Sequence, residues 1–395
     1  MRPKGLFFSL PSVSVSRTLT SVIDGIAAAG YDIIYYNTAD FRPVGDHAFS
    51  FRSYPENFEA HYSEKINEGI SYFEFGEILI DAAAGVMDFL VGEIARERPC
   101  FVLHSHLAVW GKLIAMRYGL PAVTLFTTFI LDKRIMLPFF RQLNAGKSGG
   151  LGHVSEAVNV YRKWRNLYVR LQLKGEPDLW DVYINKGQLN LSFILPSFQP
   201  RRDILGPEYR FMGYPLEYND EGAKKELIYV AMGTILNKDI AFYLLCIDVL
   251  KDLQIDCVLS VGAAVCIGEL GEIPGHIRVE KFTRQPEVLQ RSRLFITRGG
   301  MASVHESVYA RTPMIVIPMI PEQQQTAGKV QELGIGIHIP TEQLTRDRLK
   351  AAIREILDNE ATYTARLDVL SKEFPVSPPQ TTASEIVDGY LKSVI

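Results

Sequence analysis

Residues 295–309 read Phe295-Ile-Thr-Arg-Gly-Gly-Met-Ala-Ser-Val-His-Glu-Ser-Val-Tyr309, and this stretch decides the fold of the second half of the chain. A buried strand expected at 294–296 runs through two glycines into a helix expected at 302–310. Paired glycines let a backbone approach a ligand closely, and the first N–H groups of a helix bind phosphate groups. The stretch therefore predicts a strand, a tight turn and a helix whose first turn binds a diphosphate.

Two side chains strengthen this prediction. Arg298, directly before Gly299 and Gly300, is a permanently charged group that can bind a phosphate through two N–H donors. Ser303, one helical turn further on, adds a hydroxyl donor. In the alternative interpretation the glycines only form a tight turn and Arg298 lies on the surface.

Acidic and amide groups are expected at the same edge of the sheet. Glu306, Glu322 and Gln323 lie on or near helix starts, where they can accept hydrogen bonds from sugar and ribose hydroxyls. Each of them alone is typical of a solvated helix face. Their shared location favours a binding role.

Strands and helices alternate on both sides of this stretch, which indicates parallel sheets. The second half contains strands expected at 227–230, 257–261, 278–281 and 314–317, with helices at 240–253 and 322–332. The first half contains strands expected at 5–10, 32–37, 101–104 and 122–126, with helices at 17–29, 77–95 and 107–118. The fold class is therefore α/β, with two Rossmann-like, doubly wound domains that face each other across a cleft.

Composition between the two patterns sets the expected domain boundaries. We expect an acceptor-binding domain at 1–205, a Pro-, Gly- and Tyr-rich linker at 206–220, a nucleotide-sugar-binding domain at 221–375 and a returning C-terminal helix at 376–395. Residues 144–152 are expected to form a mobile loop. The following segment, up to residue 189, is expected to be a helical insertion on the acceptor side.

Composition also excludes several classes of protein. Hydrophobic residues make up 47% of the 395 residues, so the chain is globular. A net charge of −3 provides no field that attracts nucleic acid. Four cysteines without paired spacing indicate neither a zinc site nor a disulfide framework. No apolar run is long enough for a membrane span, so we expect a cytoplasmic protein without integral membrane association.

Three motifs in order carry a resemblance to a known family. They are residues 282–289, Phe-Thr-Arg-Gln-Pro-Glu-Val-Leu; residues 297–306; and residues 313–323, Pro-Met-Ile-Val-Ile-Pro-Met-Ile-Pro-Glu-Gln, which lead into residues 330–336. Together they resemble the donor site of family 1 glycosyltransferases with the GT-B fold, especially the bacterial branch that glycosylates macrolides and other natural products. The likeness is weaker over residues 38–75 and 144–196.

The resemblance implies roles for this chain's residues. Gln285 would read the uracil edge and Glu306 would bind the ribose diol, while Gly300 and Ser303, next to Arg298 and Gly299, would bind the diphosphate. Glu322 and Gln323 would hold the sugar hydroxyls, and Thr234 would line the diphosphate. It implies no metal and no cofactor, with the UDP-sugar as a co-substrate, because helix N-termini neutralise the leaving diphosphate.

The catalytic dyad of the family is absent. The usual histidine aligns with Val15 in an acceptor-side loop that includes Ser14 and Ser16, and the usual aspartate aligns with Ser105. Arg298 also replaces a histidine of the donor motif. Either the acceptor is already nucleophilic, as a carboxylate or an acidic phenol would be, or another group is the base, or the chain is a non-catalytic relative.

Three residues are candidates for a replacement base: His106, His104 and Asp132. His106 is expected at the end of a strand, facing the cleft. His104 has the alternative interpretation of a buried core histidine, and Asp132 that of a surface charge or helix cap.

The function expected from these observations is inverting, metal-free transfer of a sugar from a UDP-sugar, or a dTDP-sugar, to a small hydrophobic natural product. The missing dyad leaves open an auxiliary, nucleotide-binding relative of a transferase. A nucleotide-sugar epimerase or phosphorylase on the same architecture is the third alternative.

Overall fold

A computed structural model describes residues 2–56, 58, 71–135, 150–216, 225–233 and 239–395. The chain divides into two compact units, and each is described by itself. The first comprises Met1–Pro215 together with Pro375–Ile395, and the second comprises Leu216–Phe374.

The first unit is built on a parallel sheet in the order β3-β2-β1-β4-β5-β6-β7. Its strands are β1 (Lys4–Phe8), β2 (Asp32–Asn37), β3 (Ser50–Ser53), β4 (Phe101–Ser105), β5 (Ala122–Phe126), β6 (Leu189–Ser192) and β7 (Tyr209–Phe211). The central strands β4 and β5 are buried along their whole length, as expected for a parallel sheet with helices on both faces. The order reverses between β1 and β4, which is the topological switch point of such a sheet.

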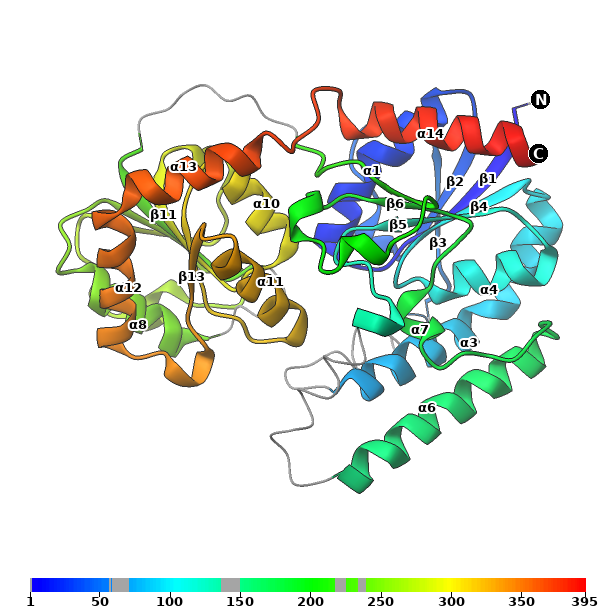
Figure 1. Ribbon diagram of the computed structural model, residues 1–395, viewed down its shortest axis with the longest axis horizontal. Helices are drawn as coiled ribbons and strands as arrows, with labels where there is room; N and C mark the ends of the chain where they lie inside the picture. The colour runs from blue at the N-terminus through cyan, green and yellow to red at the C-terminus, as the bar shows by residue number, and fades with distance from the viewer. Residues whose placement is uncertain (1, 57, 59–70, 136–149, 217–224, 234–238) are drawn as a thin grey trace. The chain divides into compact units, whose positions relative to one another are not determined.

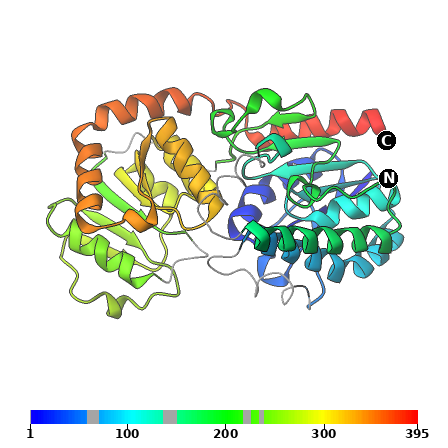
Figure 2. The ribbon, with the colours of Figure 1, turned by 60° about the horizontal axis from the view of Figure 1, so that its bottom comes forward.

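Helices cover both faces of this sheet. On one face α1 (Val13–Ala28) packs against α14 (Pro379–Val394), the terminal helix drawn in red in Figure 1. The residues of this face, among them Phe7, Leu103 and Val387, form one apolar cluster. The opposite face is covered by α3 (Tyr72–Glu97), α4 (Val109–Tyr118), α6 (Gly150–Arg170) and α7 (Asp181–Ile184), with α6 packed on α3 (Figure 2).

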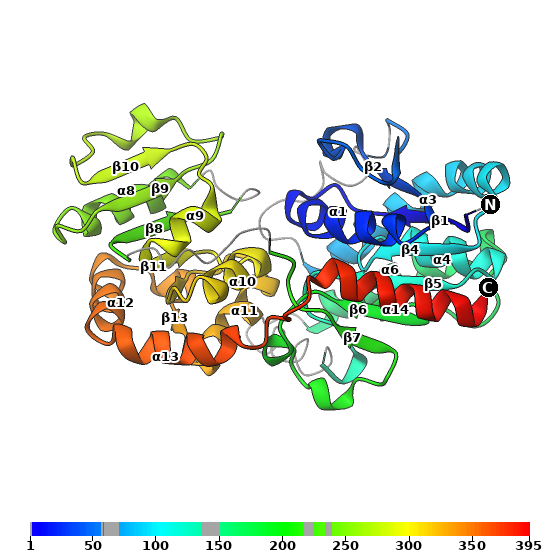
Figure 3. The same cartoon turned by 90° about the horizontal axis from the view of Figure 1, so that it is seen from above.

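The second unit has a parallel sheet in the order β10-β9-β8-β11-β12-β13, which can be followed in Figure 3. Its strands are β8 (Leu227–Ala231), β9 (Cys257–Ser260), β10 (Ile277–Glu280), β11 (Ser292–Thr297), β12 (Met314–Val316) and β13 (Gly336–His338). Its helices are α8 (Ile240–Leu250), α9 (Gln285–Gln290), α10 (Met301–Tyr309), α11 (Pro321–Glu332), α12 (Arg346–Asp358) and α13 (Glu360–Ser371). The switch point here lies between β8 and β11.

The expected α/β class with two doubly wound units is confirmed, and several details differ. The expected linker 206–220 contains β7, which pairs with β6, so residues 209–211 belong to the first sheet. Strands β3, β6, β7 and β13 are three or four residues long and were not predicted. The predicted helical segment up to residue 189 is divided into α6 and α7. Residues 144–149 of the expected mobile loop lie outside the described residues.

No helix in the described part of the chain is long and apolar enough to cross a membrane.

A network of charges ties the sheet of the first unit to the end of α3. Glu97 accepts hydrogen bonds from Lys4 Nζ at 2.8 Å and from Arg52 Nη1 at 3.0 Å, and Tyr36 donates to Glu93 at 2.6 Å. The hydrogen bond from Lys4 and that from Arg52 lower the pKa of the Glu97 carboxyl from its ordinary 4.5 to about 2. The ionised form of Glu97 is therefore the one that the fold stabilises.

We predict that Glu97→Gln lowers the free energy of unfolding at neutral pH. The variant should also lose less of this free energy than the unsubstituted protein when the pH is lowered. Because the folded-state pKa lies below the ordinary value, the contribution of Glu97 is complete above about pH 4.5 and is lost as pH falls toward about 2, with an upper bound of about 3 kcal/mol. Urea unfolding of both proteins between pH 2 and 7 measures this contribution to the free energy of unfolding. Asp88→Asn is the matched control, because Asp88 pairs with Arg170 at the surface and is expected to contribute less than about 1 kcal/mol.

Candidate functional site

The glycine pair follows β11, one of the two strands at the switch point of the second unit. Gly299 adopts φ +83°, and a Cβ there would lie 2.5 Å from Cγ1 of Val316. Both the left-handed backbone and the close contact with β12 require glycine. Gly300, the N-cap of α10, has φ −59°, and a Cβ there would meet no atom within 4 Å. The backbone at the start of α10 therefore has open space in front of it.

The first turn of α10 is suited to an anion. It contains no acidic residue, and its glycine N-cap cannot offer a side-chain acceptor to the first N–H groups. These groups carry the positive end of the helix dipole. The turn can bind a phosphate through backbone donors alone.

Three predicted residues meet beside this turn. Gln285, the first residue of α9, donates from Nε2 to Ser303 Oγ at 3.0 Å and to Glu306 Oε2 at 2.7 Å. Its Oε1 accepts from Tyr229 Oη at 3.4 Å. Glu306 is only 1% exposed, so this amide fixes the direction of a buried carboxylate. Reading a base edge with the Gln285 side chain would require it to give up these partners.

Arg298 is buried and forms an ion pair. It is 2% exposed, so the alternative interpretation that it lies on the surface is wrong, and its Nη2 donates to Asp239 Oδ2 at 2.7 Å. The guanidinium lies over the ring of Phe242 at 5.0 Å from the centroid. Its buried Nε has no hydrogen-bond partner among the described residues. Arg298 is thus directed at the start of α8, and an interaction with diphosphate stays a prediction.

Asp239 is a residue of this site that we did not predict. It is the N-cap of α8 and accepts from Phe242 N at 3.0 Å, while its other carboxylate oxygen binds Arg298. The ion pair therefore joins the two loops that follow β8 and β11. The sequence carried one indication of it, an aspartate directly before the expected helix at 240.

The remaining predicted donor residues are only partly described. Glu322 and Gln323 lie half-buried in the first turn of α11. Gln323 Oε1 accepts from the backbone N–H of Met319 at 2.8 Å, so this side chain caps its own helix. Thr234 lies outside the described residues. The structure thus brings Gln285, Ser303 and Glu306 together at α10.

The expected acceptor-side loop of the first unit is helical. Ser14, Val15 and Ser16 belong to the first turn of α1, which begins at Val13, so the expectation of a loop is corrected. Val15 is 9% exposed and packs in the apolar cluster of that face. Ser16 Oγ accepts from Asn37 Nδ2 at 3.1 Å, which ties the helix start to the end of β2.

His104 and His106 are buried on the side of the sheet opposite α1. His104 Nε2 contacts Thr124 Oγ1 at 3.1 Å, and its Cβ lies against Gly111 of α4. His106 stacks on Phe126 and is 3% exposed, so it is buried. The prediction that it faces a cleft is wrong. Burial lowers the pKa of His104 to about 4 and that of His106 to about 3. Both imidazoles are neutral at pH 7 and are weak bases.

Asp132, the third predicted base, is engaged by a neighbour. Arg134 donates to it from Nε at 2.8 Å and from the backbone N–H at 2.9 Å. The side-chain bond from Arg134 is the main cause that lowers the pKa of Asp132. A carboxylate held in this way is a poor proton acceptor near neutral pH.

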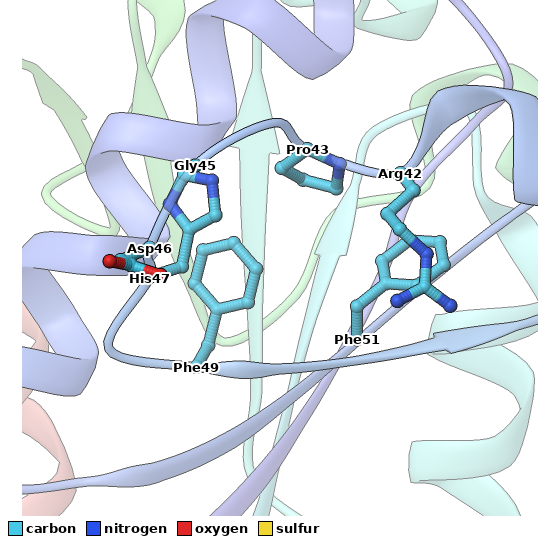
Figure 4. Close-up of a pocket in the computed structure, with 7 residues that line it drawn as sticks. All are labelled: Arg42, Pro43, Gly45, Asp46, His47, Phe49 and Phe51. Atoms are coloured by element: carbon cyan, nitrogen blue, oxygen red, sulfur yellow. The ribbon is translucent and has the colours of Figure 1, made fainter.

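A pocket that the sequence did not predict lies beside α1 in the first unit (Figure 4). Its lining includes Arg42, His47, Phe49 and Phe51. The His47 ring stacks on Phe49, and its Nδ1 lies 2.6 Å from Asp24 Oδ2. None of the predicted site residues lines this pocket. Elsewhere in the described residues, no group of three or more His, Cys, Asp or Glu is arranged to hold a metal ion.

We predict unequal losses of stability when the two glycines are replaced. Gly299→Ala must accommodate a strained φ and a clash with Val316, and is expected to lower the free energy of unfolding by about 2–4 kcal/mol. Gly300→Ala is expected to cost less than about 1 kcal/mol, because its Cβ meets open space. Urea unfolding of both variants without ligand tests this. Equal losses would contradict the assigned geometry.

We also predict that Arg298 and Asp239 are energetically coupled. Each single change, Arg298→Met or Asp239→Ala, leaves one partner unpaired and should cost roughly 1.5–3 kcal/mol. The double variant should cost clearly less than the two single losses added together. A double-mutant cycle by urea unfolding gives the coupling energy, and additivity of the two losses would show that the pair contributes nothing.

Comparison with known proteins shows similarity to glycosyltransferases. The family model described as the erythromycin biosynthesis protein CIII-like C-terminal domain matches residues 245–389, which include the Gly-Gly turn and α10. The chain is 29% identical to an uncharacterised UDP-glucosyltransferase, YojK, of Bacillus subtilis (strain 168) over 369 residues, 89% of this chain and 87% of that protein.

Two further relatives extend over nearly the whole chain. Demethyllactenocin mycarosyltransferase of Streptomyces fradiae is 22% identical over 406 residues, which cover 98% of this chain and 86% of that protein. The crystal structure of the glycotransferase of kitacinnamycin superposes with a TM-score of 0.82 at 23% identity, covering 99% and 100% of the two chains, and shares the fold. The chain therefore has the GT-B fold, and over most of its length its sequence is similar to bacterial UDP-glucosyltransferases and natural-product glycosyltransferases.

Proposed function

We propose that this glycosyltransferase moves a sugar from a UDP-sugar to a small hydrophobic natural product, with inversion and without a metal ion. The observation that carries the proposal is the cluster of Gln285, Ser303 and Glu306 beside the open first turn of α10. It combines a positive helix end for a diphosphate with a fixed, buried carboxylate for a diol.

In this proposal the helix start, rather than a metal ion, stabilises the charge on the leaving group. Charge develops on the diphosphate as the glycosidic bond breaks, and backbone N–H groups at a helix start stabilise such charge without reorganising. Gly300 leaves these groups uncovered. Glu322 and Gln323, in the first turn of α11, would bind the sugar hydroxyls.

The choice between UDP and dTDP depends on Glu306. A carboxylate that binds both ribose hydroxyls distinguishes a ribonucleotide from a 2′-deoxyribonucleotide, because the latter lacks one of the two donors. A UDP-glucosyltransferase among the relatives supports UDP, and the natural-product names of other relatives support a hydrophobic acceptor. The free cysteines suit the reducing cytoplasm, where we place the protein.

The second candidate function is an auxiliary protein that binds nucleotide-sugar without turnover. The presence of Val15 and Ser105, neither of which can accept a proton at neutral pH, favours it. Incubation of purified protein with UDP-glucose distinguishes the two, since slow hydrolysis of the donor indicates a catalytic site. An isomerised sugar in the same NMR spectra would instead indicate an epimerase.

We predict that Glu306→Ala and Gly300→Ala each weaken UDP binding by roughly ten- to a hundredfold. Glu306→Ala removes charge-assisted hydrogen bonds to the ribose, and Gly300→Ala places a methyl group where the diphosphate approaches the backbone. Isothermal titration calorimetry with UDP, dTDP and UDP-glucose measures both. Glu306→Ala should also reduce the preference for UDP over dTDP.

Thermal unfolding without ligand is the control for both variants. Gly300→Ala should melt close to the unsubstituted protein, so its loss of affinity belongs to the site. Absence of binding of any nucleotide by the unsubstituted protein at millimolar concentration would contradict the proposed function.

A further inference from the structure

The switch point of the first unit, between β1 and β4, is where an open α/β sheet places its ligand. On the α1 side, Ser9 directly follows β1 and Ser105 is the last residue of β4. They follow Phe7 and Leu103 by two positions and so point to the same face. Asn37, in the same row on β2, donates to Ser16 Oγ in the first turn of α1. The row Ser9, Asn37, Ser105 therefore faces the start of α1.

None of these side chains can take a proton from an alcohol near neutral pH. The row itself contains hydroxyls and an amide, and α1 opposes it with Val15 and Ser16. The two histidines beside this row, His104 and His106, have their rings on the other face against Thr124 and Phe126. Asp132 is held by Arg134. Within the described residues, the α1 side of this switch point offers no general base.

The same place favours an anion. The first turn of α1 has no acidic residue, and its N–H groups carry the positive end of a sixteen-residue helix. Ser9 Oγ and Ser105 Oγ are fully buried, face this turn and have no hydrogen-bond partner among the described residues. Two hydroxyl donors without an acceptor, beside a helix start, are suited to bind a negatively charged oxygen.

We propose that the acceptor of this enzyme reacts through an acidic hydroxyl, a carboxylic acid or an acidic phenol, which binds as the anion at the start of α1. The proposal rests on the sugar transfer proposed above and names its acceptor class. The acceptor oxygen supplies the electron pair for the new bond to the anomeric carbon. The bond from that carbon to the diphosphate oxygen breaks, and its electron pair leaves with UDP. No proton has to be removed, so no general base is required.

Matched acceptors test this class directly. With UDP-glucose as donor, benzoate is compared with benzyl alcohol, and 4-nitrophenol with 4-nitrobenzyl alcohol, each pair differing in acidity but little in shape. We expect kcat/KM at least roughly a hundredfold higher for each acid than for its alcohol, because a positioned base contributes about 10²–10⁴-fold to alcohols and is missing here. The benzoate and 4-nitrophenol arms separate carboxylic acids from phenols.

The pH dependence provides a second readout. For 4-nitrophenol, kcat/KM should rise with the ionisation of the acceptor itself, and for benzoate it should stay level across neutral pH. His106→Ala should leave both rates within about twofold, since His106 lies on the opposite face of the sheet. The proposal would be overturned if the enzyme used alcohols as well as acids and if kcat/KM for the alcohols rose with pH through the ionisation of an enzyme group.

A gain of function tests where the acceptor oxygen lies. Val15→His with Ser105→Asp places a base and its orienting carboxylate on the α1 side of the switch point. We expect the double variant to use benzyl alcohol at least roughly tenfold better than the unsubstituted enzyme, with a new ascending limb near about pH 6–7. Val15→Asn with Ser105→Asn, similar in shape but without a base, is the control and should gain nothing.

The two proposals fail in different ways. An enzyme that binds UDP-glucose but transfers to neither class of acceptor contradicts the acceptor proposal and leaves the donor site standing. A protein that binds no nucleotide-sugar contradicts the proposed function itself. A double variant that is folded by circular dichroism, binds UDP and gains no alcohol activity overturns the placement of the acceptor at the start of α1.

Discussion

The left-handed backbone of Gly299 is the constraint on which the proposed donor site depends. Its φ of +83° turns the chain at the end of β11, and the absence of a side chain lets it lie against Val316 of the neighbouring strand. This turn brings Gly300 to the N-cap of α10 and leaves the first N–H groups of that helix uncovered. Glu306 follows one and a half turns later, where Gln285 from α9 can hold it. A side chain at 299 would disturb all of these positions together.

The two units use the same topology with different chemistry at their switch points. In the second unit, the loops after β8 and β11 are joined by the ion pair of Asp239 and Arg298 and lead to an open helix start. In the first unit, the corresponding place after β1 and β4 holds hydroxyls and a valine. One site is thus organised by charge, and the other contains neutral groups beside a positive helix end. This contrast suits a reaction in which both the leaving group and the nucleophile are anions.

The tertiary structure changes the interpretation of His106 as a base. His106 follows a strand of the right register and has an ordinary pKa near neutral pH, so the sequence favours it as a base. In the fold its ring turns to Phe126, and burial lowers its pKa to about 3. Which face of a sheet a side chain occupies just beyond a strand depends on the exact end of the strand. Strand ends are the part of a fold that periodicity determines least well.

The sequence by itself determined the two α/β patterns, the glycine turn and the placing of Ser303 and Glu306 in the helix that follows it. These features depend on local spacing, since parallel strands and the first turns of helices follow from runs of a few residues. Only the tertiary structure decided that Arg298 pairs with Asp239 and that β7 belongs to the first sheet. These features depend on contacts between segments distant in the chain, such as the 59 residues that separate Asp239 from Arg298. No local pattern encodes such contacts, because each is formed when the whole sheet brings its strand ends together.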